Sequence, residues 1–64
     1  MNGRAGNSDI VDIAGEIREP GTDLAFQFFD GTKTVWLPRS LCEWDELDRT
    51  MAMPSWLAMD KGLI

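Results

Sequence analysis

A turn signal at Asp30 and Gly31 constrains the fold of this chain more than any other feature of its sequence. Residues 24–29 before it and residues 33–37 after it are short, mostly apolar runs that alternate with a period of two. Asp-Gly between two such runs is a strong signal for an antiparallel β-hairpin, because glycine accepts the positive φ that tight hairpin turns need. The sequence therefore predicts two paired strands in the middle of the chain.

The alternation also predicts which side chains of this hairpin share a face. On the first strand, we expect one face to hold Leu24, Phe26 and Phe28. On the second strand, we expect Val35 and Leu37 on one face and Thr34 and Trp36 on the other. The apolar faces of the two strands then supply one side of a small core.

Residues 11–17 predict a further, half-buried strand. One side carries Val11, Ile13, Gly15 and Ile17, and the other side carries Asp12, Ala14, Glu16 and Arg18. A helix is the competing interpretation, because the apolar residues of this segment also fit a period of 3.6 residues. Gly15 in the middle of the segment and its β-branched residues favour the strand.

Turn and helix signals divide the remaining sequence. Residues 19–22 predict a type II turn in which Gly21 takes the positive φ. Pro38 ends the hairpin, because proline cannot donate to a strand ladder. The segments that follow are expected as a single turn at 39–41, a strand at 42–44, a loop at 45–49, a strand at 50–53 and a helix at 55–61. At the two helix ends, we expect Pro54 in the first turn, Gly62 as the stop, and Leu63 and Ile64 folded back as an apolar cap.

The expected fold class is mainly β (α+β), a small antiparallel sheet or partial barrel of four to five strands with one short C-terminal helix. We expect residues 1–8 to form a flexible N-terminal arm and residues 9–64 to form a single small domain. Because the chain has only 64 residues, it can bury little surface and its stability margin is thin. A homodimer interface is one way to increase that margin.

Composition excludes several functional classes. The chain has one cysteine, Cys42, so it cannot form an intramolecular disulfide. It has no histidine, so it lacks both the usual ligands of a zinc site and the usual base that activates a nucleophile. We therefore expect no enzyme, no metal and no cofactor. The sequence shows no signal peptide and no run of ~20 apolar residues, so we expect a cytoplasmic protein without membrane contact and with a reduced thiol.

Residues 43–48 hold four carboxylates in a chain whose formal net charge is -5. This charge opposes direct nucleic-acid binding and favours a basic partner. Carboxylates spaced along a rigid turn resemble successive phosphates, so the run is a candidate DNA mimic; a solvated loop that keeps the protein soluble is the competing interpretation. The candidate partner-binding residues are Glu43, Trp44, Asp45, Glu46 and Asp48, together with Asp12 and Glu16 from the first strand.

Three tryptophans are many for a chain of this length. We expect Trp36 and Trp56 mainly in the core, and Trp44, between two acidic residues, as an exposed anchor for a partner. Phe26, Phe28 and Trp36 on adjacent strands suggest an alternative, a platform on which nucleic-acid bases stack. The few, scattered basic residues weigh against that alternative.

Lys33–Leu41 and Met51–Ile64 together resemble a short module found in phage and prophage proteins. The shared pattern is an aromatic strand, a Pro-basic-Ser turn and a Pro-x-Trp-Leu-Ala-x-x-Lys-Gly-Leu-Ile ending. Within this pattern the resemblance implies fold-determining roles for Trp36, Pro38, Ser40, Pro54, Trp56, Leu57 and Gly62. The module has no activity to carry over, and the chain departs from it at residues 42–49, where the acidic run lies.

In size and charge the chain is also similar to anti-CRISPR proteins, several groups of which act as DNA mimics. These resemblances imply a phage-encoded inhibitor in the cytoplasm of the host cell. Its acidic residues would occupy the basic nucleic-acid-binding surface of a host defence complex, such as a CRISPR effector. The alternative function is a nucleic-acid-binding accessory module of phage replication or recombination that uses the aromatic sheet face.

Overall fold

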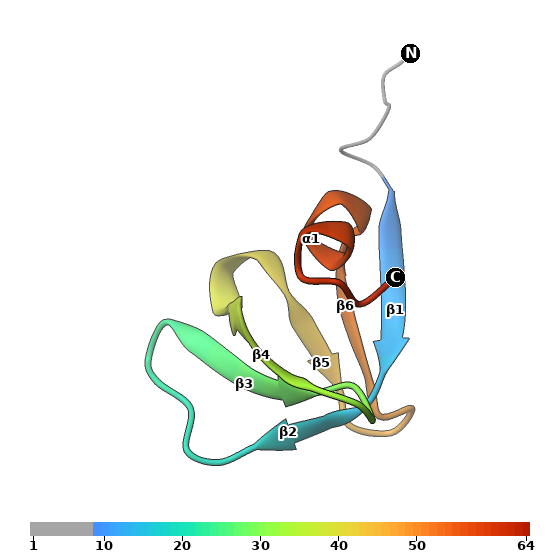
Figure 1. Cartoon of the computed structure of the whole chain (residues 1–64). Helices are drawn as coiled ribbons and strands as arrows, with labels where there is room; N and C mark the ends of the chain where they lie inside the picture. Colours follow the sequence, from blue (N-terminus) through green and yellow to red (C-terminus); the bar gives the residue numbers. More distant parts are fainter. Residues whose placement is uncertain (1–8) are drawn as a thin grey trace.

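The computed structural model describes residues 9–64, which form two antiparallel three-stranded sheets and one short α-helix (Figure 1). In chain order the elements are β1 (Ile10–Ala14), β2 (Glu16–Arg18), β3 (Ala25–Phe29), β4 (Thr34–Pro38), the 3-10 turn η2 (Arg39–Leu41), β5 (Glu43–Asp45), β6 (Thr50–Pro54) and α1 (Ser55–Asp60). The expected mainly β class with one short C-terminal helix is confirmed. The flexible arm predicted for residues 1–8 lies outside the described residues.

Gly15 divides the predicted first strand between the two sheets. β1 pairs with β6 in a sheet of order β1-β6-β5, whereas β2 pairs with β3 in a sheet of order β2-β3-β4. The predicted alternation of half-buried and exposed residues holds on both sides of this break. A Cβ atom at position 15 would overlap the carbonyl oxygen of Phe29 and lie 2.6 Å from the ring of Phe28, so the chain needs glycine there. This division raises the strand count to six.

The core lies between the inner faces of the two sheets and is completed by α1. Its buried side chains are Phe28, Leu37, Met51, Met53, Leu57 and Ala58. Register places Leu37 opposite Phe26 and Met53 opposite Val11, so apolar side chains of neighbouring strands meet on one face. Each sheet therefore contributes one apolar face to the core and leaves its other face exposed.

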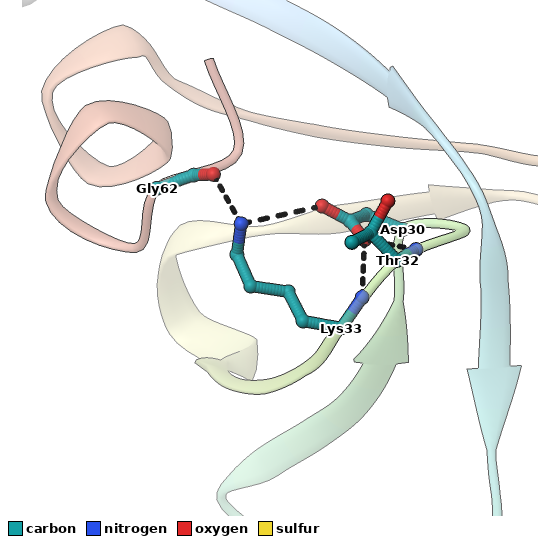
Figure 2. A network of polar contacts seen from close by, with 4 residues as sticks. All are labelled: Asp30, Thr32, Lys33 and Gly62. Atoms are coloured by element: carbon teal, nitrogen blue, oxygen red, sulfur yellow. Dashed lines mark hydrogen bonds and ion pairs between the residues drawn. The ribbon is translucent and has the colours of Figure 1, made fainter.

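The predicted hairpin is confirmed as β3 and β4. Asp30 Oδ1 accepts hydrogen bonds from the backbone N–H groups of Thr32 and Lys33, both at 2.8 Å (Figure 2). Gly31 takes a φ of 102°, as the turn signal requires. The Lys33 Nζ lies 3.7 Å from Asp30 Oδ2 and donates to the carbonyl oxygen of Gly62 at 2.6 Å. The turn therefore also holds the segment that follows α1.

The C-terminal segment confirms the predicted helix stop. Gly62 follows α1 with a φ of 74°, and the N–H of Leu63 donates to the carbonyl oxygen of Ala58 at 2.8 Å. Leu63 packs against the core, whereas Ile64 stays exposed, so only the first of the two expected cap residues folds back. Pro54 has an extended ψ of 142° and is the N-cap of α1, rather than a residue of its first turn.

The loop between β2 and β3 is not the predicted type II turn, because Gly21 does not take a positive φ. Thr22 Oγ1 instead accepts hydrogen bonds from the N–H groups of Leu24 at 3.2 Å and Ala25 at 3.0 Å. Arg39 Nε donates to the carbonyl oxygen of Thr22 at 2.7 Å. A contact with a residue distant in sequence thus contributes to the conformation of this loop, and local turn preferences do not include it.

Candidate functional site

The outer face of the β1-β6-β5 sheet brings together acidic residues from segments that are far apart in the sequence. Ala52 of β6 lies directly opposite Asp12 of β1 on one side and Glu43 of β5 on the other. Directly opposite residues of antiparallel strands project from the same face, with Cβ atoms roughly 5 Å apart. The two carboxylates therefore flank the small side chain of Ala52. The next row of this face holds Asp45, opposite Thr50.

The turn between β5 and β6 extends this acidic face. Asp45 Oδ1 accepts hydrogen bonds from the N–H groups of Leu47 at 3.0 Å and Asp48 at 3.1 Å. The backbone closes the turn where the N–H of Arg49 donates to the carbonyl oxygen of Asp45 at 2.8 Å, with Arg49 at a φ of 58°. The carboxylate of Asp45 therefore supports the turn as well as contributing charge.

Trp44 is not the exposed anchor that the sequence predicted. It lies opposite Met51, a core residue, and its ring packs edge-on against Phe28 with the ring centroids 6.2 Å apart. Its Nε1 donates to Glu46 Oε1 at 2.8 Å. The alternation along β5 turns Trp44 inward while its two acidic neighbours stay exposed. Trp44 therefore holds the Glu46 carboxylate in place through a hydrogen bond from the inner side of the sheet.

Leu47 is the residue of this face that sequence reasoning missed. It lies in the turn between β5 and β6, and 93% of its surface is exposed, more than for any other large apolar residue among residues 9–64. One sequence signal could have indicated its exposure. Leu47 is the single leucine among the carboxylates of residues 43–48, and it falls in the loop expected at residues 45–49. Leu47, rather than Trp44, is therefore the exposed apolar side chain of this face.

Within the described part of the chain, the carboxylates of the acidic face form no ion pair with a lysine or arginine. The ion pairs there join Glu16 to Arg18, with the closest atoms 3.8 Å apart, and Asp30 to Lys33 at 3.7 Å. The exposed carboxylates outside these pairs include the five that form the acidic face: Asp12, Glu43, Asp45, Glu46 and Asp48. Their mutual repulsion is therefore offset by solvent and salt rather than by a described lysine or arginine.

Glu16 does not belong to this face. It lies on β2, opposite Phe29, in the other sheet, and it pairs with Arg18. The prediction treated Asp12 and Glu16 as neighbours on one polar face, because both fall on the exposed side of one long strand. The break at Gly15 assigns them to different sheets.

The predicted aromatic platform does not form. Phe28 is fully buried, and Phe26 lies beneath the guanidinium of Arg39, whose Cζ is 4.3 Å from the ring centroid. Trp36 lies opposite Gln27 and projects from the other side of the sheet with 47% of its surface exposed. The expectation that Trp36 and Trp56 are mainly core residues is also wrong, since Trp56 is 54% exposed. Trp36 is exposed because side chains alternate along β4. Val35 and Leu37 point toward the core, so Trp36 between them points away from it.

Two open depressions lie side by side on the outer face of the β1-β6-β5 sheet. The acidic depression is lined by residues that include Asp12, Glu43 and Leu47, and the other depression by residues that include Ile10 and Leu41.

Within residues 9–64 no group of three side chains could hold a metal ion, and no helix is long and apolar enough to cross a membrane. No family model, curated protein or solved structure matches this chain. The outer face of the β1-β6-β5 sheet presents exposed carboxylates beside apolar side chains.

Proposed function

We propose that this chain is a phage-encoded inhibitor that uses its acidic face to occupy a basic nucleic-acid-binding surface of a host defence complex, such as a CRISPR effector. The observation that supports this function is the set of five exposed carboxylates without a described basic partner. These carboxylates come from β1, β5 and the turn that follows β5. The resemblance of the flanking segments to a phage module and the small, acidic character of the chain support the phage setting.

Electrostatic complementarity is the physical basis of the proposal. An unneutralised negative surface accelerates encounter with a positive groove, and the effect falls steeply as ionic strength rises. The hydrogen bonds from Trp44 to Glu46 and from the turn backbone to Asp45 hold two of the carboxylates in place. Groups held in position before binding lose less conformational freedom when the partner arrives.

The test uses Glu43 and Asp48, two of the three exposed carboxylates of the face whose side chains accept no hydrogen bond within residues 9–64. Asp45 and Glu46 are unsuitable, because their side chains accept hydrogen bonds that hold the turn and Trp44. Glu43→Lys combined with Asp48→Lys reverses two charges and leaves those bonds intact. The matched control is Glu19→Lys with Asp60→Lys, which makes the same change in net charge at two exposed positions elsewhere.

The measurement is the binding of target DNA by purified CRISPR effectors in the presence of increasing amounts of each chain. We expect the wild type and the control pair to displace DNA, and the Glu43/Asp48 pair to need at least tenfold more protein. The salt dependence of inhibition should also be weaker for the Glu43/Asp48 pair. Failure of the wild type to displace DNA, or equal potency of the two charge-reversed pairs, would show that the acidic face does not act as proposed.

A further inference from the structure

The acidic face continues into an apolar depression. This second depression, of about 360 Å³, has the exposed side chains of Ile10 and Leu41 at its walls and Cys42 and Ala52 among its lining residues. Ile10 is 57% exposed and Leu41 is 42% exposed, so both present apolar surface to solvent. Cys42 is half-buried and packs against the core, and burial raises the pKa of its thiol.

The two depressions share Glu43 and Ala52, so the apolar and acidic parts form one continuous surface. Glu43 stands at their boundary, with Asp12 across Ala52 from it. A solubilising acidic loop needs no apolar hollow beside it, and a pure phosphate mimic needs only charge. Adjoining apolar and charged areas are instead typical of surfaces that bind proteins.

We infer that the partner contacts this surface through a protein segment in which a large aliphatic or aromatic side chain is flanked by lysine or arginine. The apolar side chain enters the depression between Ile10 and Leu41, and the flanking cations lie against Asp12, Glu43 and Asp45. The charge of the face selects this occupant, because an acidic or neutral apolar segment gains nothing from the carboxylates. This inference rests on the proposed function and narrows its partner to a basic protein surface that carries an apolar contact residue.

The test compares two synthetic pentapeptides as probes, each with lysine or arginine at four positions. One carries leucine at its centre and the other carries serine, so the charge is the same. NMR titration of the labelled chain gives the two Kd values, and the amide signals of Cys42 and Ala52 report contact in the depression. We expect the leucine peptide to bind about tenfold more tightly than the serine peptide and to shift both signals.

Two variants test whether the depression causes that difference. Ile10→Thr with Leu41→Ser removes the apolar walls, and Ala52→Leu fills the floor from an exposed sheet face. Each should abolish the preference for leucine. The Ile10→Thr with Leu41→Ser pair should also leave the affinity for the serine peptide unchanged, because neither residue lines the acidic depression. Leu24→Ser is the control, because Leu24 is 81% exposed and lines neither depression. It should keep the full preference.

The outcomes separate this inference from the proposed function. Equal affinity for the two peptides, or a preference that survives both depression variants, would overturn the inference and leave an electrostatic surface in place. Binding of neither peptide would overturn it as well. The proposed function is tested separately, by the effect of Glu43→Lys with Asp48→Lys on DNA displacement. That effect requires no apolar contact, so it can be present even if the inference about the apolar depression fails.

Discussion

The indole Nε1 of Trp44 donates a hydrogen bond to Glu46 Oε1 at 2.8 Å, which links the core directly to the acidic turn. The ring of Trp44 packs against Phe28, whereas the carboxylate it holds is exposed to solvent. One residue thus serves both the fold and the candidate site. Substitutions here can separate the charge of Glu46 from the hydrogen bond that positions it.

Glu46→Gln removes the charge and keeps an oxygen that can accept the indole N–H. We expect it to change the free energy of unfolding by less than about 0.5 kcal/mol. Trp44→Phe keeps an aromatic ring and deletes the donor, and should cost about 1 kcal/mol or more. Urea denaturation of both variants measures the difference. Equal destabilisation by the two would mean that the charge, rather than the hydrogen bond, supports the turn.

Gly15→Ala should destabilise the fold by about 1–3 kcal/mol, because its Cβ would overlap the carbonyl oxygen of Phe29 and approach the ring of Phe28. Ala14→Ser, one position earlier on the exposed side of β1, should stay within about 0.5 kcal/mol of the wild type. Thermal unfolding followed by circular dichroism compares the two. A Gly15→Ala variant as stable as Ala14→Ser would contradict the close approach of Gly15 to β3.

Asp30 should make stability depend on pH. Hydrogen bonds from the N–H groups of Lys33 and Thr32 hold the pKa of its carboxyl below the ordinary value of 3.8. The folded state therefore favours the charged form. This contribution is complete above the pKa of the unfolded chain and is lost as pH falls through the lower pKa of the folded chain.

The pH dependence is tested by comparing the wild type with Asp30→Asn in urea at neutral pH and at successively lower pH values. The stability advantage of the wild type should shrink as the pH falls below about 4. Asp60→Asn, on the exposed end of α1, is the matched control for the loss of one carboxylate elsewhere on the surface. An advantage that stays constant or grows on acidification would rule out the role assigned to the Asp30 carboxylate.

Lys33→Met should loosen the segment that follows α1. It removes the bond from Nζ to the carbonyl oxygen of Gly62, shown in Figure 2, and keeps an unbranched apolar side chain. Because both groups are partly exposed, we expect a loss of only about 0.5–1.5 kcal/mol. Hydrogen exchange should accelerate at Leu63, whose N–H closes the helix end. Unchanged exchange at Leu63 would indicate that the hairpin does not hold this segment.

The features that were predictable from the sequence depend on neighbouring residues. The period of two along residues 11–18 assigned the exposed side chains of β1 and β2, and Asp30 with Gly31 placed the hairpin. Gly62 marked the end of α1. Each of these signals acts through backbone geometry within a few residues, which is why a single sequence contains it.

The wrong predictions concern features that do not depend on neighbouring residues alone. Trp36 and Trp56 were assigned to the core because of their size, but the core volume is filled by Phe28, Leu37 and two methionines on facing sheets. Hydrophobicity alone does not say which of several large residues will be buried. That choice depends on which face of β4 and which side of α1 meet the core, and Trp36 and Trp56 lie on the sides that face away from it.

The sequence by itself determined the mainly β class, the central hairpin, the helix stop and an excess of negative charge near residue 45. Only the tertiary structure decided that Gly15 splits one strand between two sheets, and that β6 pairs with both β1 and β5. That pairing sets Asp12 and Glu43 on either side of Ala52 and leaves Glu16 on the other sheet. The physical reason is that cross-strand pairing joins residues by register across the whole chain, whereas local preferences act over a few residues.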